Sequence, residues 1–293
     1  MVEQIRQGDN IMKKLIALML TVALSVACFV SITACDKNAY KAVKLESVSA
    51  ESYGFAVKKG QNANILAACN TVIGKSDFKT KVDELVIYYT AVYGGETPKN
   101  LSFSLPDLSD NTAGTLKVGT EAGFAPFEFL DNGGINDVAG LDVAIMMMVA
   151  EELNYKLEIV DMNFKSLPAA LTGANPTIDI IAAGFTIDDE RAKTMDFSDN
   201  YFTSTQYIVC ASDKSYSKIE DLKGLKIAVQ TGTTGDFMVA DAIELEEGEL
   251  YGSNAECIGY DSITSAMLDL KKGSIDCIIV DELPAKSLIA ANK

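Results

Sequence analysis

Histidine is missing from all 293 residues of this chain. A Ser-His-Asp triad, a Cys-His pair and a His-based metal site are therefore excluded, which is the strongest argument in the sequence against a hydrolase. Positive charge is scarce as well, because 25 Lys and Arg stand against 41 Asp and Glu, for a formal net charge of -16. This imbalance argues against nucleic acid or an anionic membrane surface as a partner and fits a secreted acidic protein.

The amino terminus reads as a targeting segment. Lys13 and Lys14 precede an apolar run over residues 15–32, whose length suits either a signal peptide or a transmembrane helix. The run ends in small residues that lead directly to Cys35, which resembles a lipoprotein signal starting at Met12. We predict a signal peptide over residues 1–35 and a lipid on Cys35 that tethers the protein to the outer face of a membrane.

The remaining cysteines show no CxxC spacing, so we expect no metal site and no cofactor. They are Cys69, Cys210, Cys257 and Cys277. Cys210 and Cys277 lie within apolar runs, which favours buried small hydrophobic residues. A disulfide stays open, but the sequence assigns no pair.

The most informative stretch covers residues 183–202. Residues 180–183 form an apolar run that predicts a buried strand, and Gly184 ends it with a backbone that a ligand can approach closely. Acids at 188–190 then predict the first turn of a helix. Arg191 lies one turn in, where its planar fork could take a carboxylate bidentately. The alternative is a surface helix whose Arg191 pairs with a neighbouring acid.

This stretch closely resembles the signature of the family 3 extracellular solute-binding proteins, the receptors of polar amino acid ABC transporters. The resemblance extends over nearly all of the chain beyond the signal peptide. It implies a two-lobed α/β fold, similar to type II periplasmic binding proteins. Each lobe would contain a mostly parallel sheet flanked by helices, and a two-segment hinge would join the lobes. Alternating short strands and helices from Leu116 onward agree with this class.

The order of the segments departs from that family. Residues 51–60 read as a strand with a glycine turn, and 63–73 and 79–93 read as helices; together they resemble the tail that normally ends a family member. We interpret the order as a circular permutation, which surface termini permit. A tandem remnant and a truncated chain that swaps its tail stay open.

This interpretation sets the expected domain boundaries. Lobe 2 would comprise residues 36–53 and 204–293, lobe 1 residues 54–94 and 115–203, with a linker over 95–114. It also predicts that Lys293 lies close to residues 40–45.

The resemblance implies partners for both charges of a free amino acid, which need matched groups once removed from water. Arg191 would take the α-carboxylate, helped by the backbone N–H of Thr186. Asp281, at the end of an apolar strand, would receive the α-ammonium together with the carbonyl of Gly184. Because Arg191 and Asp281 belong to different lobes, one zwitterion would bridge them and favour a closed cleft. Asp281 could instead cap a helix beginning at Pro284.

Further binding roles follow from the same resemblance. Thr233 and Thr234 would offer N–H groups at a helix start, a natural anion site, although threonine there also serves as a helix cap. Phe124 and Phe164 would sandwich the ligand side chain; either ring could equally be core. The specificity positions are Glu121 and Gln230. An acid at 121 suits a basic or amide side chain, whereas a Glu121 that caps a loop would remove that inference.

The sequence thus predicts a monomeric, non-enzymatic lipoprotein outside the cytoplasm. It would bind a polar, possibly basic or amide, L-amino acid and hand it to an ABC permease. The alternative is an enzyme on the same fold, similar to dehydratases or lytic transglycosylases, with Glu121, Asp281 or Glu282 as general acid or base. A sensory module and a chain that no longer binds a ligand are further possibilities.

Overall fold

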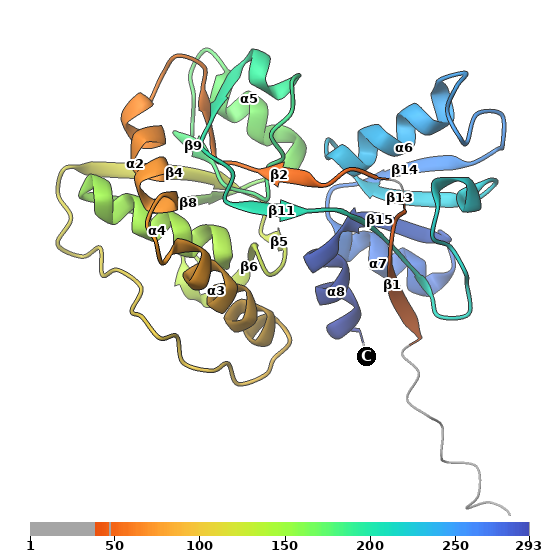
Figure 1. Cartoon of the computed structure of the whole chain (residues 1–293), viewed down its shortest axis with the longest axis horizontal. Helices are drawn as coiled ribbons and strands as arrows, with labels where there is room; N and C mark the ends of the chain where they lie inside the picture. The colour runs from red at the N-terminus through yellow and green to blue at the C-terminus, as the bar shows by residue number, and fades with distance from the viewer. Residues whose placement is uncertain (1–38, 47, 293) are drawn as a thin grey trace, which may run out of the picture. The chain divides into compact units, whose positions relative to one another are not determined.

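The computed structural model describes residues 39–46 and 48–292 (Figure 1). The predicted signal peptide, Cys35 and Lys293 lie outside these residues. Within the described ranges, no helix combines the length and hydropathy that a membrane crossing requires.

The first lobe is built on a five-stranded sheet in which parallel pairing occupies one side. Strand β4 pairs parallel with β8 and β9, while β3 pairs antiparallel with β9 and β10. The order across the sheet is β10 (Met195–Phe197), β3 (Ala56–Lys58), β9 (Ile180–Ile181), β4 (Gly114–Thr120) and β8 (Tyr155–Asp161). Its helices are α2 (Ala63–Ile73), α3 (Phe78–Tyr93), α4 (Leu141–Leu153) and α5 (Leu167–Thr172). Helix α4 is almost entirely buried, because it packs on the sheet and is covered by α2 and α3.

The second lobe repeats this design. Strand β13 pairs parallel with β14 and β15, and β12 pairs antiparallel with β15 and β1. The order is β1 (Tyr40–Lys44), β12 (Gln206–Ala211), β15 (Cys277–Asp281), β13 (Lys226–Gln230) and β14 (Glu256–Tyr260). The helices are α6 (Thr234–Glu244), α7 (Ile263–Lys272) and α8 (Glu282–Ala290).

A two-stranded ribbon connects the two lobes (Figure 1). Strand β2 (Glu51–Tyr53) pairs antiparallel with β11 (Phe202–Ser204), with Tyr53 opposite Phe202 and Glu51 opposite Ser204. The expected two-segment hinge is therefore present. Strands β3 and β12 both start from this ribbon, so they run against the parallel strands. For that reason two of the four strand pairings in each sheet are antiparallel. The prediction of mostly parallel sheets expected fewer antiparallel pairings.

The helix predicted after Asp188 is wrong. Only a short 3-10 helix, Arg191–Lys193, forms there, and β10 follows at Met195. The Asp188 carboxylate accepts the backbone N–H of Arg191, and its carbonyl accepts that of Ala192. One turn is thus closed locally, and the chain then joins the sheet instead of continuing as a helix. The helix predicted over 63–73 is confirmed at these bounds, and the one over 79–93 begins one residue earlier.

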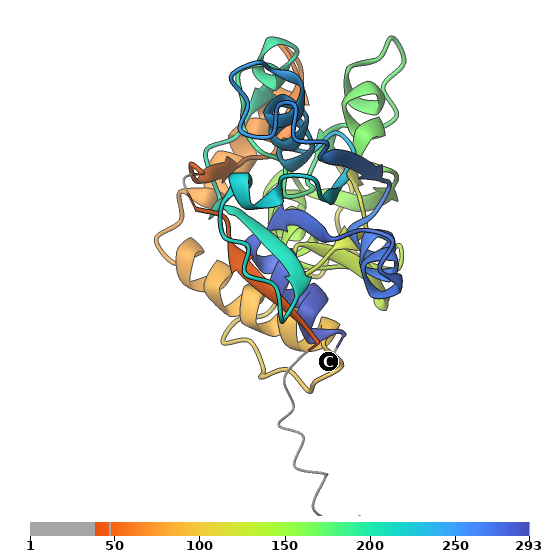
Figure 2. The same ribbon diagram turned by 90° about the vertical axis from the view of Figure 1, so that its right-hand side faces the viewer.

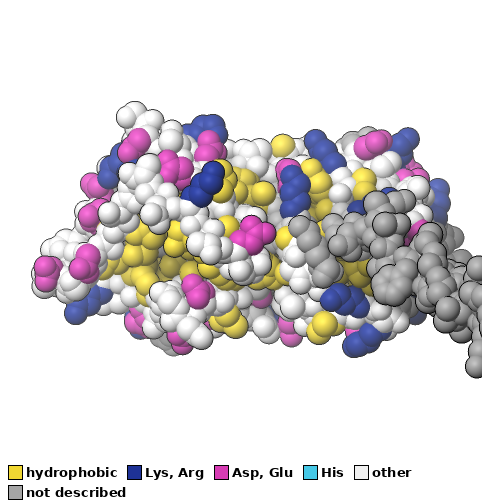
Figure 3. Space-filling model, turned by 90° about the horizontal axis from the view of Figure 1, so that it is seen from below, with side chains coloured by type: hydrophobic (Ala, Val, Ile, Leu, Met, Phe, Trp, Pro, Cys, Tyr) yellow, Lys and Arg dark blue, Asp and Glu magenta, His cyan; other side chains and the backbone are white. Residues whose placement is uncertain are grey.

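Residues 95–113 carry no helix or strand and run along α3. Leu101, Phe103, Leu105 and Leu108 pack against the core of the first lobe. A groove of about 270 Å³ lies between this segment, α3 and the three-stranded sheet of β5 (Gly123–Phe124), β6 (Glu128–Ile135) and β7 (Val138–Ala139). Apolar side chains gather on this side of the first lobe (Figure 3).

The two ends of the described fold lie side by side in the second lobe. Helix α8 packs on β1 and on β12, and both views agree on this placement (Figures 1 and 2). Of the segments on which the permutation was inferred, β3 joins the sheet of the first lobe and β2 forms the ribbon with β11, while α2 and α3 pack in the first lobe. Whether the order arose by permutation stays a prediction.

Candidate functional site

The guanidinium of Arg191 is fixed by backbone carbonyls from both lobes. Its Nη1 donates to the carbonyl of Thr186 at 2.8 Å, and its Nη2 donates to the carbonyl of Gly232, across the cleft, at 3.2 Å. Nε forms an ion pair with Asp188 at 3.2 Å, and only 10% of the side chain is exposed. The alternative of a neighbouring acid paired with Arg191 is thus realised, but the arginine is buried at the interface between the lobes.

Aromatic rings support the same guanidinium. Its central carbon lies 4.0 Å from the ring centroid of Phe185 and 5.7 Å from that of Phe164. Burial lowers the pKa of Arg191, and the negative charges of Asp188, Glu51 and Asp281 oppose that shift. The positive charge of Arg191 therefore lies near three carboxylates. Asp188 belongs to the same turn, whereas Glu51 and Asp281 are far away in the sequence.

Asp281 ends β15 and faces the ribbon. It is 7% exposed, and its Oδ2 accepts a hydrogen bond from Nε2 of Gln206 at 3.2 Å. Its Oδ1 has no hydrogen-bond partner among the described residues. Burial, followed by the charge of Glu51, raises the pKa of Asp281 to about 7. The position is the N-cap of α8, yet the side chain makes no capping bond, so the alternative of Asp281 as a helix cap is wrong.

Other buried polar atoms of the described chain near Asp281 make no well-formed hydrogen bond. They are Tyr53 Oη, Ser204 Oγ, Thr205 Oγ1 and Gln206 Oε1. All belong to the ribbon or to the residues directly after it. The hydroxyls of Tyr53 and Ser204 nevertheless lie close enough to the Asp281 carboxylate to oppose the rise in its pKa. A buried polar group without a hydrogen bond is costly, so a group that donates hydrogen bonds to these atoms would be stabilised here.

Glu51, on β2, is a site residue that the sequence reasoning missed. Its Oε2 accepts the hydroxyls of Thr186, in the first lobe, at 2.8 Å and of Thr234, in the second lobe, at 2.6 Å. Its Oε1 accepts Nε2 of Gln206 at 2.8 Å. One carboxylate of the ribbon therefore connects both lobes. The only sequence signal was an acid at the start of the strand read over 51–60, which gives no information about partners far along the chain.

The start of α6 shows the capping role considered for its threonines. Thr233 is the N-cap, and its hydroxyl accepts the N–H of Asp236 at 3.2 Å. Its own N–H donates to the carbonyl of Gln230 at 3.3 Å, so that N–H is already used. Thr234 instead directs its hydroxyl to Glu51. The anion-binding role of the two threonine N–H groups stays a prediction.

Glu121 and Gln230 form a second contact between the lobes. Gln230 Nε2 donates to Oε2 of Glu121 at 2.9 Å and to the carbonyl of Asp261 at 3.2 Å. Burial raises the pKa of Glu121 to about 7, although the bond from Gln230 opposes this. Nearby, Lys165 pairs with Asp261 at 2.7 Å across the rim, where both side chains are exposed. The two predicted specificity residues are thus brought together.

The two rings predicted to sandwich the ligand side chain each pack on another phenylalanine, and the sandwich itself stays a prediction. Phe124 stacks on Phe127, with centroids 5.8 Å apart, and Phe164 packs on Phe185 at 5.5 Å. Both rings are buried, in different hydrophobic clusters. Phe124 nonetheless borders Gly184, because a Cβ added there would lie 2.8 Å from its ring.

A buried acid pair fixes the backbone at Gly184, whose φ is +53°. Asp142 accepts the N–H of Gly184 at 3.0 Å and the hydroxyl of Tyr201 at 2.7 Å. Burial raises the pKa of Asp142 to about 7 and that of Glu128 well above its ordinary value, the latter also because Asp142 is close. These residues were missed because only the fold brings them under the site.

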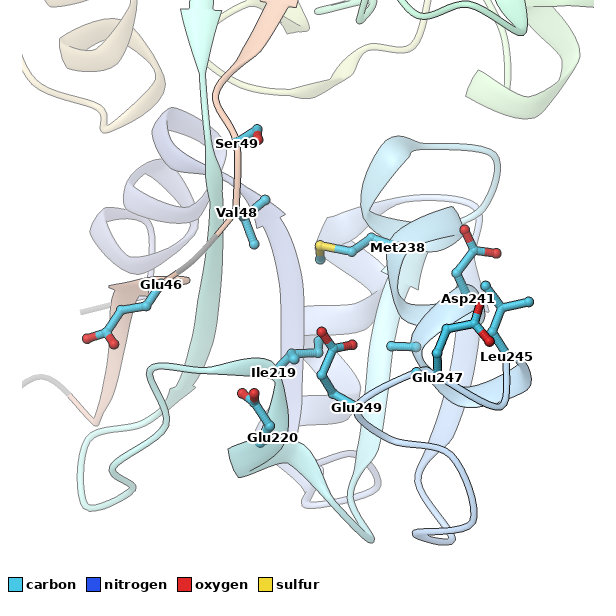
Figure 4. Close-up of a pocket in the computed structure, with 12 residues that line it drawn as sticks. Glu46, Val48, Ser49, Ile219, Glu220, Met238, Asp241, Leu245, Glu247 and Glu249 are labelled. Carbon is cyan, nitrogen blue, oxygen red and sulfur yellow. The ribbon is translucent and has the colours of Figure 1, made fainter.

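A cavity of about 570 Å³ lies on the second lobe (Figure 4). None of the predicted site residues lines it. Its acidic lining residues are Glu46, Glu220, Asp241, Glu247 and Glu249. In the described part of the chain, no group of His, Cys, Asp and Glu side chains is arranged to hold a metal ion.

Comparison with known proteins places these features in context. Residues 116–276 match the model of the bacterial extracellular solute-binding proteins, family 3. A probable histidine-binding protein of Neisseria gonorrhoeae is 34% identical over 62% of this chain and 64% of its own length, so less than two thirds of that relative is spanned. The arginine-binding extracellular protein ArtP of Bacillus subtilis is 29% identical over 66% of this chain and 73% of its length.

A solved structure of an arginine-binding protein is also similar to this chain. The arginine-bound form of a truncated ArgBP from T. maritima is similar, with a TM-score of 0.54 and 38% identity over 61% of this chain and 78% of that one. Glu51 and Asp281 both lie outside the residues that match the family model.

Proposed function

Because this chain belongs to the bacterial extracellular solute-binding proteins of family 3, we propose that it is a receptor outside the cytoplasm for a polar L-amino acid. One observation carries the proposal: Arg191 of the first lobe is buried against Gly232 of the second, close enough to the buried Asp281 for that carboxylate to act on its pKa. A zwitterion offers one charge to each. Binding it would neutralise both partners and hold the lobes together.

In the proposed binding mode, Asp281 receives the α-ammonium. Its Oδ1 makes no well-formed hydrogen bond among the described residues, and an ammonium has three protons to donate. Arg191 takes the α-carboxylate together with the backbone N–H groups of Thr186 and Thr234, while the hydroxyls of both threonines stay on Glu51. Gly184, held by Asp142, lines the same end.

The ligand we propose is cationic. Glu51, Asp281 and Glu121 face the interface between the lobes, and Arg191 is the positive charge among them. A zwitterion leaves this excess of negative charge unchanged, whereas a basic amino acid reduces it. Glu121, buried against Gln230, would take the distal positive group. The names of the relatives, which include arginine-binding proteins, point to the same class.

We further propose that the protein is a monomeric lipoprotein anchored through Cys35 and that it delivers its ligand to an ABC permease without chemical change. The lobe boundaries at residues 53–54 and 203–204 and the tail-first order as a permutation belong to this proposal. The ribbon supports these boundaries, since β2 and β11 are the segments that connect the lobes.

A melting-temperature screen tests the ligand class. L-Arginine, L-lysine, L-histidine and L-glutamine are compared with agmatine, which lacks the carboxylate, and N-acetyl-L-arginine, which lacks the ammonium. A ligand at a hundred times its Kd stabilises the fold by roughly 2.7 kcal/mol. We expect the melting temperature to rise with basic L-amino acids and to stay unchanged with agmatine and N-acetyl-L-arginine. A cooperatively melting protein that responds to no amino acid would refute the receptor.

A further inference from the structure

Two cysteines lie directly opposite each other in the sheet of the second lobe. Strands β12 and β15 pair antiparallel, with Gln206 opposite Asp281 at one end and Cys210 opposite Cys277 at the other. Both cysteines are fully buried free thiols. The sequence placed them correctly in apolar runs but could not pair them.

The hydrogen bonds around β12 show which kind of pair they form. Opposite residues of an antiparallel ladder alternate between hydrogen-bonded and non-hydrogen-bonded pairs. The N–H of Glu282 donates to the carbonyl of Thr205, so that pair is hydrogen-bonded, and counting along the register makes Cys210–Cys277 non-hydrogen-bonded. On the other edge, the N–H of Leu45 donates to the carbonyl of Gln206. Even-numbered residues of β12 therefore direct their backbone to β1, which gives the same result.

This geometry matches that of a disulfide. Non-hydrogen-bonded partners have Cα atoms roughly 4.5 Å apart with side chains on the same face. A disulfide requires a Cα separation of roughly 4.4–6.8 Å. Both cysteines belong to one cluster with Ile208 and Ile279, which confirms the shared face.

The other cysteines of the described chain are poor competitors. Cys69 belongs to the core of the first lobe. Cys257, on β14, lies opposite Ile227 of β13, and β13 separates it from β15. Strand neighbours are roughly 4.8 Å apart, so two strand spacings exceed the reach of a disulfide.

We propose that Cys210 and Cys277 are a covalent cross-linking site, oxidised to a disulfide when the chain folds in oxidising surroundings. The two thiols lose two protons and two electrons, and one S–S bond forms. The oxidant is another disulfide, such as glutathione disulfide or that of a thiol oxidase, which is reduced to two thiols. Burial raises the pKa of both thiols, so the exchange takes place while the strands are still accessible during folding.

The cross-link would fix the strand register on which the cleft depends. A slip of one residue turns every side chain of a strand to the opposite face. In the observed register Gln206 lies against Asp281, and its Nε2 donates to that carboxylate. A disulfide at the far end of the same two strands excludes the slipped pairings.

Refolding with a redox buffer tests the proposal. The full chain is unfolded, refolded with oxidised and reduced glutathione, alkylated and digested, and the peptides are identified by mass spectrometry. We expect a linked peptide pair containing Cys210 and Cys277, with Cys69 and Cys257 alkylated. Alkylation of both Cys210 and Cys277, or a link that joins either of them to another of the chain's six cysteines, would overturn the assignment.

Melting temperatures supply an independent measurement. Reductant should lower the melting temperature of the oxidised protein by about 5–15 °C. Cys210→Ala, which keeps the site small and apolar, should remove this dependence, while Cys69→Ala serves as a matched control that retains it. An equal response to reductant in Cys210→Ala and the parent protein contradicts the cross-link. Because the readouts need no ligand, they are independent of the proposed receptor function.

Discussion

The two lobes differ in how well the protein itself satisfies the charged group that each contributes to the proposed site. Arg191, in the first lobe, is held by the carbonyls of Thr186 and of Gly232 in the second lobe. Asp188 and the ring of Phe185 also contact it. In the second lobe, Asp281 is buried with one oxygen unpartnered among the described residues. The guanidinium of Arg191 is therefore oriented before a ligand binds. The carboxylate of Asp281 is destabilised by burial until a cation binds to it. We infer that Arg191 positions the ligand and that Asp281 gains most from its binding.

Removing the arginine should have the largest effect. Arg191→Ala deletes the charge-assisted bonds to the ligand carboxylate, and we expect the Kd to rise at least about 100-fold. Isothermal titration with the ligand found in the screen measures this. Lys193→Ala, in the same 3-10 helix but exposed, is the matched control and should bind normally. Unchanged affinity in Arg191→Ala would remove the first lobe's charge from the site.

Neutralising the aspartate should weaken binding to a similar but smaller extent. Asp281→Asn keeps the shape and loses the charge, and we expect a Kd roughly 30–100-fold higher. The same change should raise the stability of the ligand-free protein at pH 8. It removes a buried carboxyl group whose ionisation at that pH destabilises the folded state, as its raised pKa indicates. Urea unfolding with and without ligand separates the two effects. Tighter binding in the variant would contradict the comparison between the lobes.

The ligand-free protein should lose stability as the pH rises from about 4 to 7. Asp281, Glu121 and Asp142 have pKa values raised to about 7, so the folded state binds more protons than the unfolded state in this window. Each such group changes the unfolding free energy by up to about 1.4 kcal/mol per pH unit. Their stabilisation is complete below the ordinary carboxyl pKa and is lost through pH 7. Urea titrations across this range check the sign, and Asp281→Asn should flatten the slope.

The hinge carboxylate should have the smallest effect. Glu51→Gln keeps the side-chain length but weakens the bonds from Thr186 and Thr234, so closure becomes less favourable. We expect the Kd for a basic amino acid to rise about 5–10-fold, with less compaction on ligand addition in X-ray scattering. Glu46→Gln, an exposed acid on the approach to the same strand, is the control. A gain in affinity would instead indicate that Glu51 competes with the ligand carboxylate.

The local pattern predicted well where a segment's own residues decide its conformation. The apolar spacing over residues 63–73 gave a helix at those bounds, and the apolar run at 180–183 gave the buried strand β9 over its first two residues. The helix predicted after Asp188 failed, because one side chain closed the turn and β10 offered sheet pairing with β3. Such competition is decided by the sheet, which the local sequence does not contain.

The sequence by itself determined the class of the protein: the family signature around Arg191, the absence of histidine and the two-lobed alternation all follow from residue order. Only the tertiary structure decided the partners of the charges. Glu51 meets Thr186 and Thr234, Asp142 meets Gly184, and Cys210 meets Cys277. Periodicity is a local property set by the backbone repeat, whereas these pairs join distant residues through the path of the chain. That path is fixed by which faces must be buried together.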